Sequence, residues 1–164
     1  MTIEATGRVV EGVKGRDLVL MRSFALSAAE LWKYLTDASL TAEWFGPWEG
    51  DGNPGSSIRI ILKFEENEPA VRARVLACAA PTHLALETVD EYGSWNLELF
   101  VEEDGDEDSL LRFVHHLDDD ANVGDVGPGW EYYLDLLVAA TEETEQPNFD
   151  QYYPALSAHY LAQV

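Results

Sequence analysis

The chain has 164 residues with 31 acidic and 10 basic side chains, which gives a formal net charge of −21. This excess of acid disfavours nucleic acid and anionic lipid as partners, because both are bound by basic surfaces. No run of about 18 apolar residues is present, so no membrane-spanning helix is expected. The N-terminus lacks the basic and apolar blocks of a signal peptide, and the single cysteine, Cys78, allows no internal disulfide. We therefore expect a cytoplasmic protein with no membrane or nucleic-acid partner.

The first part of the chain predicts a strand pair followed by short helices. Residues 6–11 and 17–26 have strand-like composition and are separated by a glycine-containing loop. A capping box formed by Ser27 and Glu30 marks the start of a first helix, which ends near residue 37. A second short helix is expected over 41–45, where a glycine–proline pair ends it. Two short helices at this point would close one end of a sheet.

The middle of the chain predicts a meander of strands after a turn cluster at 50–55. The expected strands are 58–64, 71–77, 83–89, 94–102 and 109–117. With the N-terminal pair, this makes about seven strands. Alternation in the second of these segments predicts an inner face made of Val71, Ala73, Val75 and Ala77. The acidic run 102–108 lacks the spacing of a calcium loop and is interpreted as a solvated hairpin tip.

Residues 124–142 predict one long helix that is apolar around much of its girth. One face carries residues at spacings of three and four, namely Trp130, Tyr133, Leu134, Leu137 and Thr141. Pro128 suits the first helical turn, where its missing N–H would have no partner. A narrow polar strip on the other side is formed by Glu131, Asp135 and Glu142. Such a helix needs a wide partner, so we expect a curved antiparallel sheet around it, with room between them for a small molecule.

The end of the chain is a polar segment followed by an aromatic tail. Asp150 is expected to cap a last short helix that carries Tyr152, Tyr153, Leu156 and Tyr160. We expect this tail to pack back onto the domain, and a dimer contact is the alternative use. The chain shows no internal repeat. The predicted organisation is a single domain over 1–164, with about 147–164 as its C-terminal extension.

Several local segments occur in an order typical of a known family. These segments are Arg16-Asp17-Leu18-Val19, Ala42-Glu43-Trp44-Phe45-Gly46, Phe113-Val114-His115-His116, Gly129-Trp130 and the tail 149–156. Their order resembles that of the START-like or Bet v 1-like superfamily (SRPBCC). Within it, the chain is most similar to bacterial proteins that resemble the C-terminal domain of the activator of Hsp90 ATPase. The likeness covers nearly the whole chain.

The resemblance implies an α+β helix-grip fold. A curved antiparallel sheet of six to seven strands would wrap around the long C-terminal helix, with two short helices after the first long strand. Family members often hold apolar small molecules between sheet and helix, and no cofactor is expected. Some relatives are cyclases or hydrolases, and others are transporters. Activation of Hsp90 is discounted, because in the eukaryotic co-chaperone a separate N-terminal domain supplies much of the chaperone contact.

A cavity in this fold would be lined by residues from three parts of the chain. The mouth would be formed by Trp44, Phe45 and Trp48. The sheet would contribute Ile60, Leu62, Val75, Leu86, Trp95, Leu97, Phe113 and His115, and the long helix Trp130, Tyr133, Leu134 and Leu137. Polar contacts would come from the histidine, the tyrosine and the indole N–H groups. The alternative is that all these side chains simply fill a core.

His115 is the sharpest single candidate. It alternates with Leu111, Phe113 and Leu117, so it is expected to point inward, while His116 faces outward. His115 would either orient a ligand carbonyl or act as an acid or base, or it would be a neutral core histidine bonded to a tyrosine or a carbonyl. No nucleophile motif or metal-ligand spacing is present in the sequence.

The function expected from the sequence is therefore the binding of a small apolar or aromatic ligand, without a metal. The first alternative is an enzyme of the same fold, similar to a cyclase, dehydratase or hydrolase, that uses His115. The second is an interaction module that regulates a chaperone or another protein partner through its surface. A homodimer is a further option that the sequence leaves open.

Overall fold

A computed structural model describes residues 3–13, 15–88 and 95–164 of the chain. In this part of the chain the elements follow one another as β1 (Arg8–Glu11), β2 (Arg16–Phe24), α1 (Ala28–Thr36), α2 (Ala38–Thr41), β3 (Trp48–Gly50), β4 (Ser57–Ile61), β5 (Ala70–Ala79), β6 (His83–Thr88), β7 (Asn96–Glu103), β8 (Ser109–His116), α3 (Val123–Glu142), the 3-10 helix η1 (Phe149–Gln151) and α4 (Ser157–Leu161).

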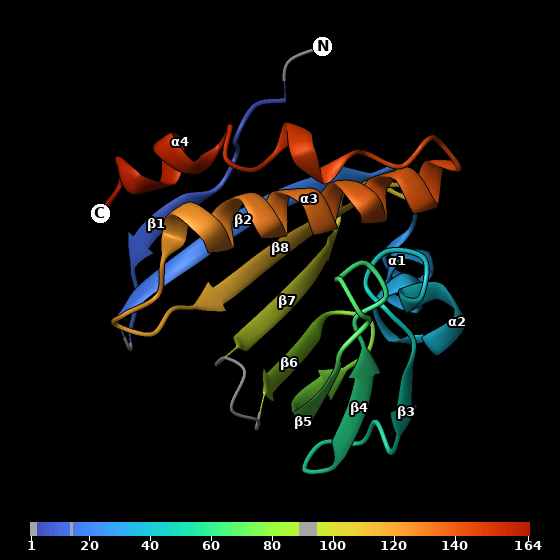
Figure 1. Cartoon of the computed structure of the whole chain (residues 1–164). Helices are drawn as coiled ribbons and strands as arrows, with labels where there is room; N and C mark the ends of the chain where they lie inside the picture. The colour runs from blue at the N-terminus through green and yellow to red at the C-terminus, as the bar shows by residue number, and fades with distance from the viewer. Residues whose placement is uncertain (1–2, 14, 89–94) are drawn as a thin grey trace.

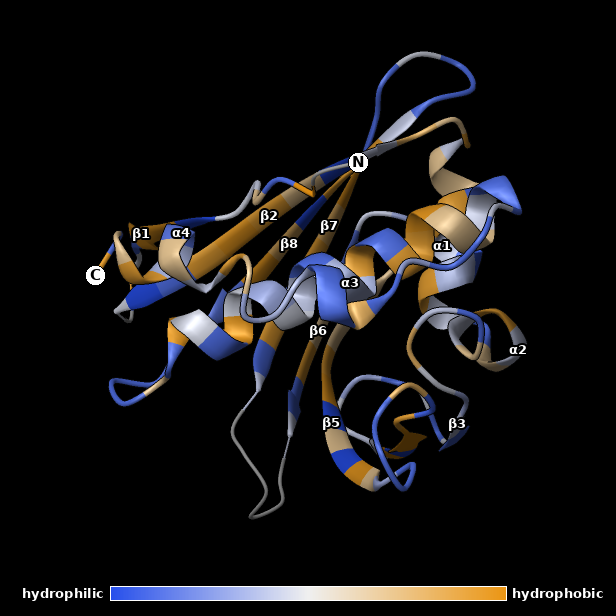
Figure 2. Ribbon diagram, turned by 45° about the horizontal axis from the view of Figure 1, so that its top comes forward, coloured by the Kyte–Doolittle hydropathy of each residue, from blue (hydrophilic) through white to orange (hydrophobic). Residues whose placement is uncertain are grey.

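The described strands form one antiparallel sheet in the order β1-β2-β8-β7-β6-β5-β4-β3, so β1 and β3 are its edges. The sheet is curved, and α3 crosses its concave side (Figure 1). The strands β2 and β8 behind α3 are largely hydrophobic, whereas much of the visible face of α3 is hydrophilic (Figure 2). This architecture confirms the helix-grip fold, with eight described strands in place of the expected six to seven.

The additional strand is β3, which the sequence analysis did not predict. Its three residues pair with β4, with Trp48 opposite Ile60 and Gly50 opposite Ile58. Three residues are too few to show the alternation by which a strand is recognised. Around the sheet, α1 packs against β7 and β8, and α2 packs against β3. No helix in the described ranges is both long enough and apolar enough to span a lipid bilayer.

The first helix begins as its sequence predicts. The Ser27 hydroxyl accepts a hydrogen bond from the Glu30 amide, and the Glu30 carboxylate accepts one from the Ser27 amide, each at 3.2 Å. The second helix is shifted from the predicted 41–45 to Ala38–Thr41. The reason is Asp37, whose carboxylate accepts from the Ser39 amide at 2.9 Å and starts a new helix where α1 ends.

A bulge in β5 changes which residues of this strand face inward. The register with β6 shifts between Val75 and Ala77, so two residues oppose one at this point. Val75 is buried, Leu76 is 43% exposed, Ala77 joins the convex side of the sheet and Cys78 lines the interior. The prediction that Ala77 continues the inner face is therefore wrong, because strict alternation holds only without a bulge.

Near its start, α3 contains a proline, and the hydrogen bond that this proline cannot make is replaced by one from the C-terminal segment. Asn122 caps the helix by accepting from the Gly124 amide at 3.0 Å, so Pro128 lies in the second turn and not in the first as predicted. A proline inside a helix has no N–H for the carbonyl four residues before it. That carbonyl, on Gly124, accepts instead from the Ser157 hydroxyl at 2.6 Å.

Two members of the predicted polar strip of α3, Glu131 and Asp135, lie between β2 and the C-terminal segment, whereas Glu142 is exposed. Glu131 is only 1% exposed. Its carboxylate accepts from the Thr6 amide at 2.6 Å, from Arg22 Nη2 at 2.7 Å and from the Tyr160 hydroxyl. Burial alone would raise the pKa of Glu131, but these bonds outweigh it and the pKa is lowered. Asp135 binds the same arginine through Nε at 3.0 Å.

Tyr160 connects the C-terminal segment to both the helix and the N-terminal segment. It is fully buried, and its ring occupies the space next to Gly127 of α3. A Cβ atom on Gly127 would lie 2.4 Å from this ring, so only glycine allows the approach. In Figure 1, α4 and the chain before it run along α3 on the side away from β7 and β8.

Candidate functional site

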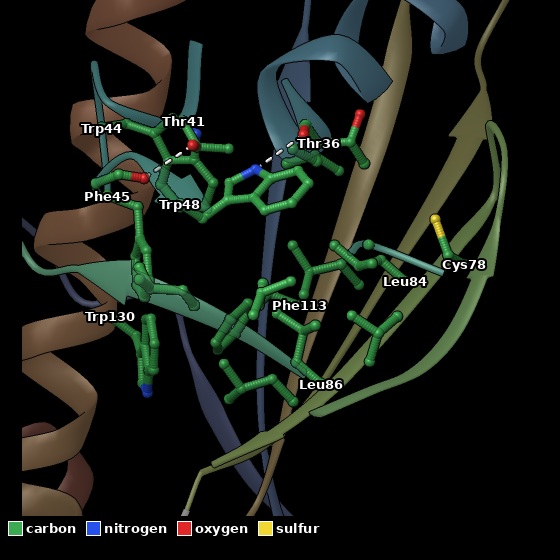
Figure 3. A pocket seen from close by; sticks show the side chains of 18 residues that line it. Thr36, Thr41, Trp44, Phe45, Trp48, Cys78, Leu84, Leu86, Phe113 and Trp130 are labelled. Atoms are coloured by element: carbon green, nitrogen blue, oxygen red, sulfur yellow. Dashed lines mark hydrogen bonds between the residues drawn. The ribbon is translucent and has the colours of Figure 1, made fainter. Parts of the chain in front are cut away.

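A cavity of about 200 Å³ lies between the sheet, α3 and the region around α1 and α2 (Figure 3). Its walls are almost entirely apolar, and no charged side chain lines it among the described residues. The lining residues are Leu35, Thr36, Thr41, Trp44, Phe45, Gly46, Trp48, Gly52, Ile58, Ile60, Val75, Cys78, Leu84, Leu86, Leu97, Leu99, Phe113 and Trp130.

Aromatic rings form one wall of the cavity. Phe45 is stacked on Trp130, with ring centroids 6.1 Å apart and planes at 4°, and its centroid lies 5.5 Å from that of Trp44. Trp130 also packs on Phe113 at 4.6 Å. Through these contacts the segment after α2, the helix α3 and the strand β8 meet around Phe45.

The segment that carries Phe45 is fixed by the residues around it. The Thr41 hydroxyl donates to the Gly46 carbonyl at 2.8 Å, which closes the turn from α2 into β3. A Cβ atom on Gly46 would lie 1.7 Å from the carbonyl oxygen of Ile61, so a larger residue would push this segment away from β4. The cavity wall therefore depends on a glycine that allows the close approach of two backbones.

Nine of the fifteen residues that the sequence suggested as ligand contacts line this cavity. They are Trp44, Phe45, Trp48, Ile60, Val75, Leu86, Leu97, Phe113 and Trp130. The other six lie outside the lining and pack around it, namely Leu62, Trp95, His115, Tyr133, Leu134 and Leu137. Among these, Leu134 and Leu137 are fully buried, which is the core-filling alternative for that part of α3.

The polar groups expected to meet a ligand are bonded within the protein. The Trp44 and Trp48 indoles donate to backbone carbonyls, at 2.7 Å to Tyr34 and at 3.0 Å to Thr36. The second of these bonds is drawn in Figure 3. The cavity therefore offers shape and apolar surface, and its indoles are already occupied as donors.

His115 and Tyr133 are bonded in the same way. His115 is 3% exposed, and its Nδ1 accepts from Trp130 Nε1 at 3.0 Å. The Tyr133 hydroxyl donates to the carboxylate of Glu65, in the connection between β4 and β5. Burial, followed by this hydrogen bond, raises the pKa of Tyr133. Neither side chain lines the cavity, so the placement favours the reading of His115 as a core histidine, with an indole as its partner.

Nine lining residues were not predicted from the sequence, for different physical reasons. Ile58 lies on the same face of β4 as Ile60, and Leu99 on the same face of β7 as Leu97, so the alternating pattern could have predicted that both point inward. Cys78 turns inward only because of the bulge in β5. The rest are Leu35, Thr36, Thr41, Gly46, Gly52 and Leu84, which the sequence analysis did not assign to the cavity.

The convex side of the sheet carries a separate chain of polar contacts. His116 binds Asp17 through Nδ1 at 2.7 Å and Glu98 through Nε2 at 2.8 Å, and Glu98 also contacts His83 at 3.1 Å. Burial lowers the pKa of His116, but the two carboxylates outweigh it and the pKa is raised. The sequence predicted the outward direction of His116 but gave no signal for these partners, which come from three other strands. Within the described ranges, no group of such residues is arranged to hold a metal ion.

Comparison with solved structures finds the same fold in several bacterial proteins. CalU16 from Micromonospora echinospora superposes with a TM-score of 0.76 at 22% identity, over 98% of this chain and 96% of that one. A Bordetella parapertussis protein encoded by BPP1335 gives 0.73 at 21% identity, over 100% and 96%. The Aha1 dimer from Colwellia psychrerythraea gives 0.64 at 16% identity, over 77% and 96%.

The family comparison supplies the identification. A search of curated proteins finds no match. The family model described as activator of Hsp90 ATPase homolog 1-like protein matches residues 25–142, which include the cavity-lining residues and α3 but not the C-terminal segment. The match spans well over half of the chain and agrees with the observed fold. The chain therefore belongs to the activator of Hsp90 ATPase homolog 1-like family.

Proposed function

We propose that this protein binds a small apolar or aromatic molecule in the cavity between its sheet and α3. The observation that supports the proposal most strongly is an apolar space of about 200 Å³ walled by Phe45, Trp48, Phe113 and Trp130. Ligand sites are typically concave and mostly apolar. A packed core would instead leave few voids larger than a water molecule.

The energetics favour an occupant. Side chains that face an empty space lose dispersion contacts on that side, and a ligand of matching shape restores them. Burying roughly 200 Å² of apolar ligand surface would contribute about 5 kcal/mol before the entropic cost of binding. We therefore expect moderate affinity, set by shape and not by hydrogen bonds.

The position of His115 supports binding over acid–base chemistry at this site. A general acid or base must lie within hydrogen-bond reach of the reacting group. His115 lies outside the cavity lining, and its Nδ1 is occupied by Trp130 Nε1 at 3.0 Å. Acid–base chemistry through His115 Nδ1 on a ligand in this cavity would require these two side chains to separate.

The experiment is a fluorescence titration with N-phenyl-1-naphthylamine, an uncharged apolar dye, on two neighbouring variants of β5. Val75→Phe places a ring into the cavity, whereas Leu76→Phe adds the same ring on the convex side. We expect saturable one-to-one binding to the wild-type protein and to Leu76→Phe. Binding to Val75→Phe should be at least about tenfold weaker, since the ring takes the place of the ligand.

The melting temperature provides the control for folding. Filling an empty cavity is neutral or stabilising when the new ring fits, so Val75→Phe should melt within a few degrees of the wild type. Equal affinity of the dye for both variants, with both folded, would place binding elsewhere. The absence of saturable binding of the dye to the wild-type protein would refute the proposed function.

A further inference from the structure

Among the described residues, the side chains that line the cavity include no charged group and almost no free hydrogen-bond donor. The lining includes two threonines and three tryptophans, and every N–H or O–H group on these side chains already has an acceptor. The Thr36 hydroxyl donates to the Trp32 carbonyl at 2.9 Å, and the Thr41 hydroxyl to Gly46. Of the described lining side chains, Cys78 carries the one remaining polar group, a sulfhydryl that is a weak donor.

One edge of the cavity wall is formed by half-buried residues that contact one another. Five lining residues are half-buried, namely Cys78 and Leu86 on the strands β5 and β6, and Thr36, Trp48 and Gly52 near α1 and β3. The Trp48 indole donates to the Thr36 carbonyl, and a Cβ atom on Gly52 would touch the Trp48 ring at 3.1 Å. We refer to these three residues as the rim.

The charges next to the rim are mainly negative. Asp37 follows Thr36 and Asp51 precedes Gly52, and both are exposed. The basic residue one turn earlier on α1 is Lys33, which lies close enough to Asp37 to contribute to its lowered pKa, after the larger contribution of hydrogen bonds from Ser39. Its charge is thus partly offset at the rim, and the whole chain carries −21.

From this arrangement we infer that the cavity selects uncharged ligands and rejects anions of the same shape, carboxylates and sulfonates included. The inference rests on the proposed function and specifies the chemical class of its ligand. An anion inside would lose its hydration without gaining a cation or a donor, which is costly in an apolar site. The exposed carboxylates of Asp37 and Asp51, which are next to rim residues in the chain, would also repel it. A neutral aromatic molecule has no charge to desolvate and is not repelled by these carboxylates.

A matched pair of dyes tests this selection. N-phenyl-1-naphthylamine and 8-anilino-1-naphthalenesulfonate share one aromatic body and differ by the sulfonate. Binding to the cavity is taken as the part of the signal that Val75→Phe abolishes, which removes contributions from other surfaces. We expect the neutral dye to bind the cavity at least about tenfold more tightly than the sulfonate.

Two variants at the rim test the cause. Thr36→Lys places a cation at the rim, and Thr36→Met adds a side chain of similar length without charge; both lose the bond to Trp32. We expect the lysine to raise the affinity for the sulfonate by about tenfold relative to the methionine, and to leave the neutral dye within about twofold. Thermal melting of both variants confirms that they fold.

The outcomes separate the inference from the proposed function. Comparable affinity of the wild-type cavity for both dyes would overturn the inference and leave apolar binding intact. So would a lysine variant that binds the sulfonate no better than the methionine variant does. If neither dye gives a signal that Val75→Phe removes, the proposed function fails, and the inference fails with it.

Discussion

Glu131 shows how a single buried carboxylate joins three distant parts of the chain. It receives hydrogen bonds from Thr6, Arg22 and Tyr160 while only 1% exposed. In Glu131→Gln, Arg22 keeps Asp135 as its partner, but these donors lose the charge to which they are bonded, which costs roughly 1.5–3 kcal/mol. For a chain of this size each kcal/mol lowers the melting temperature by about 2–4 °C. We therefore expect Glu131→Gln to melt at least about 3 °C below the wild type.

The matched control is Glu142→Gln, on the same helix but exposed to solvent. Its effect on unfolding free energy should stay within about 0.5 kcal/mol. Equal melting temperatures for both variants in a calorimetric scan would show that the buried network contributes little.

His116 makes stability depend on pH near neutrality. Its pKa in the folded protein is raised above the ordinary value of 6.5 by Glu98 and Asp17, against the effect of burial. Such a group stabilises the fold fully below pH 6.5, and this contribution is lost as pH rises through the raised pKa. His83, which faces the same Glu98 carboxylate, belongs to the same cluster. We expect the wild type to lose melting temperature between about pH 6 and pH 8 relative to His116→Gln. Parallel curves for the two proteins over this range would contradict this account.

At the scale of elements, the contact between α3 and the C-terminal segment predicts opposite effects on stability when two nearby glycines of α3 are replaced by alanine. Alanine favours helix over glycine by about 1 kcal/mol. At Gly129 nothing lies within 4 Å of a new Cβ atom, so Gly129→Ala should stabilise the protein by up to about that amount. At Gly127 the Cβ atom would meet the Tyr160 ring at 2.4 Å, so Gly127→Ala should destabilise it by about 1–3 kcal/mol. Urea unfolding of both variants measures the two signs, and a stabilised Gly127→Ala would mean that Tyr160 is not held against α3.

Some elements could be predicted from the sequence, and others could not. Long periodic segments such as α3, and strands such as β7, have enough residues for their period to be read. The capping box of Ser27 and Glu30 acts within one turn, so it was predictable in full. By contrast, β3 has too few residues to show an alternating pattern. Cys78 faces inward because of the bulge in β5, and this bulge depends on the pairing with β6, a contact between strands that the sequence pattern does not reveal.

The same distinction applies to the candidate site. Aromatic residues on apolar faces, such as Phe45 and Trp130, were predicted because inward direction follows from periodicity. Whether an inward side chain borders a space or fills one depends on the volumes of its neighbours, and the sequence alone could not separate Val75 from Leu134. Hydrogen-bond partners also come from packing, which is why the bond between His115 and Trp130 was not foreseen.

For the whole molecule, the charge of −21 implies that salt should stabilise the fold. Like charges on a compact surface repel one another, and this repulsion is screened as the Debye length falls to about 3 Å in 1 M salt. The connection between β7 and β8 carries exposed acidic residues, including Asp106 and Glu107. We expect the melting temperature to rise with sodium chloride, and to rise less in the double variant Asp106→Asn, Glu107→Gln. Identical salt dependence in the two proteins would show that this hairpin contributes no measurable repulsion.

The central claim, that the cavity is a ligand site, can be tested at the only thiol of the chain. Cys78 is half-buried and lines the cavity, so a bound ligand should shield it. The measurement is the rate of alkylation of Cys78 by iodoacetamide in the folded protein, with and without saturating N-phenyl-1-naphthylamine. The account predicts that the rate falls in proportion to occupancy, by about tenfold or more at saturation. An unchanged rate while the dye is bound would show that the ligand lies outside the cavity and would contradict the account.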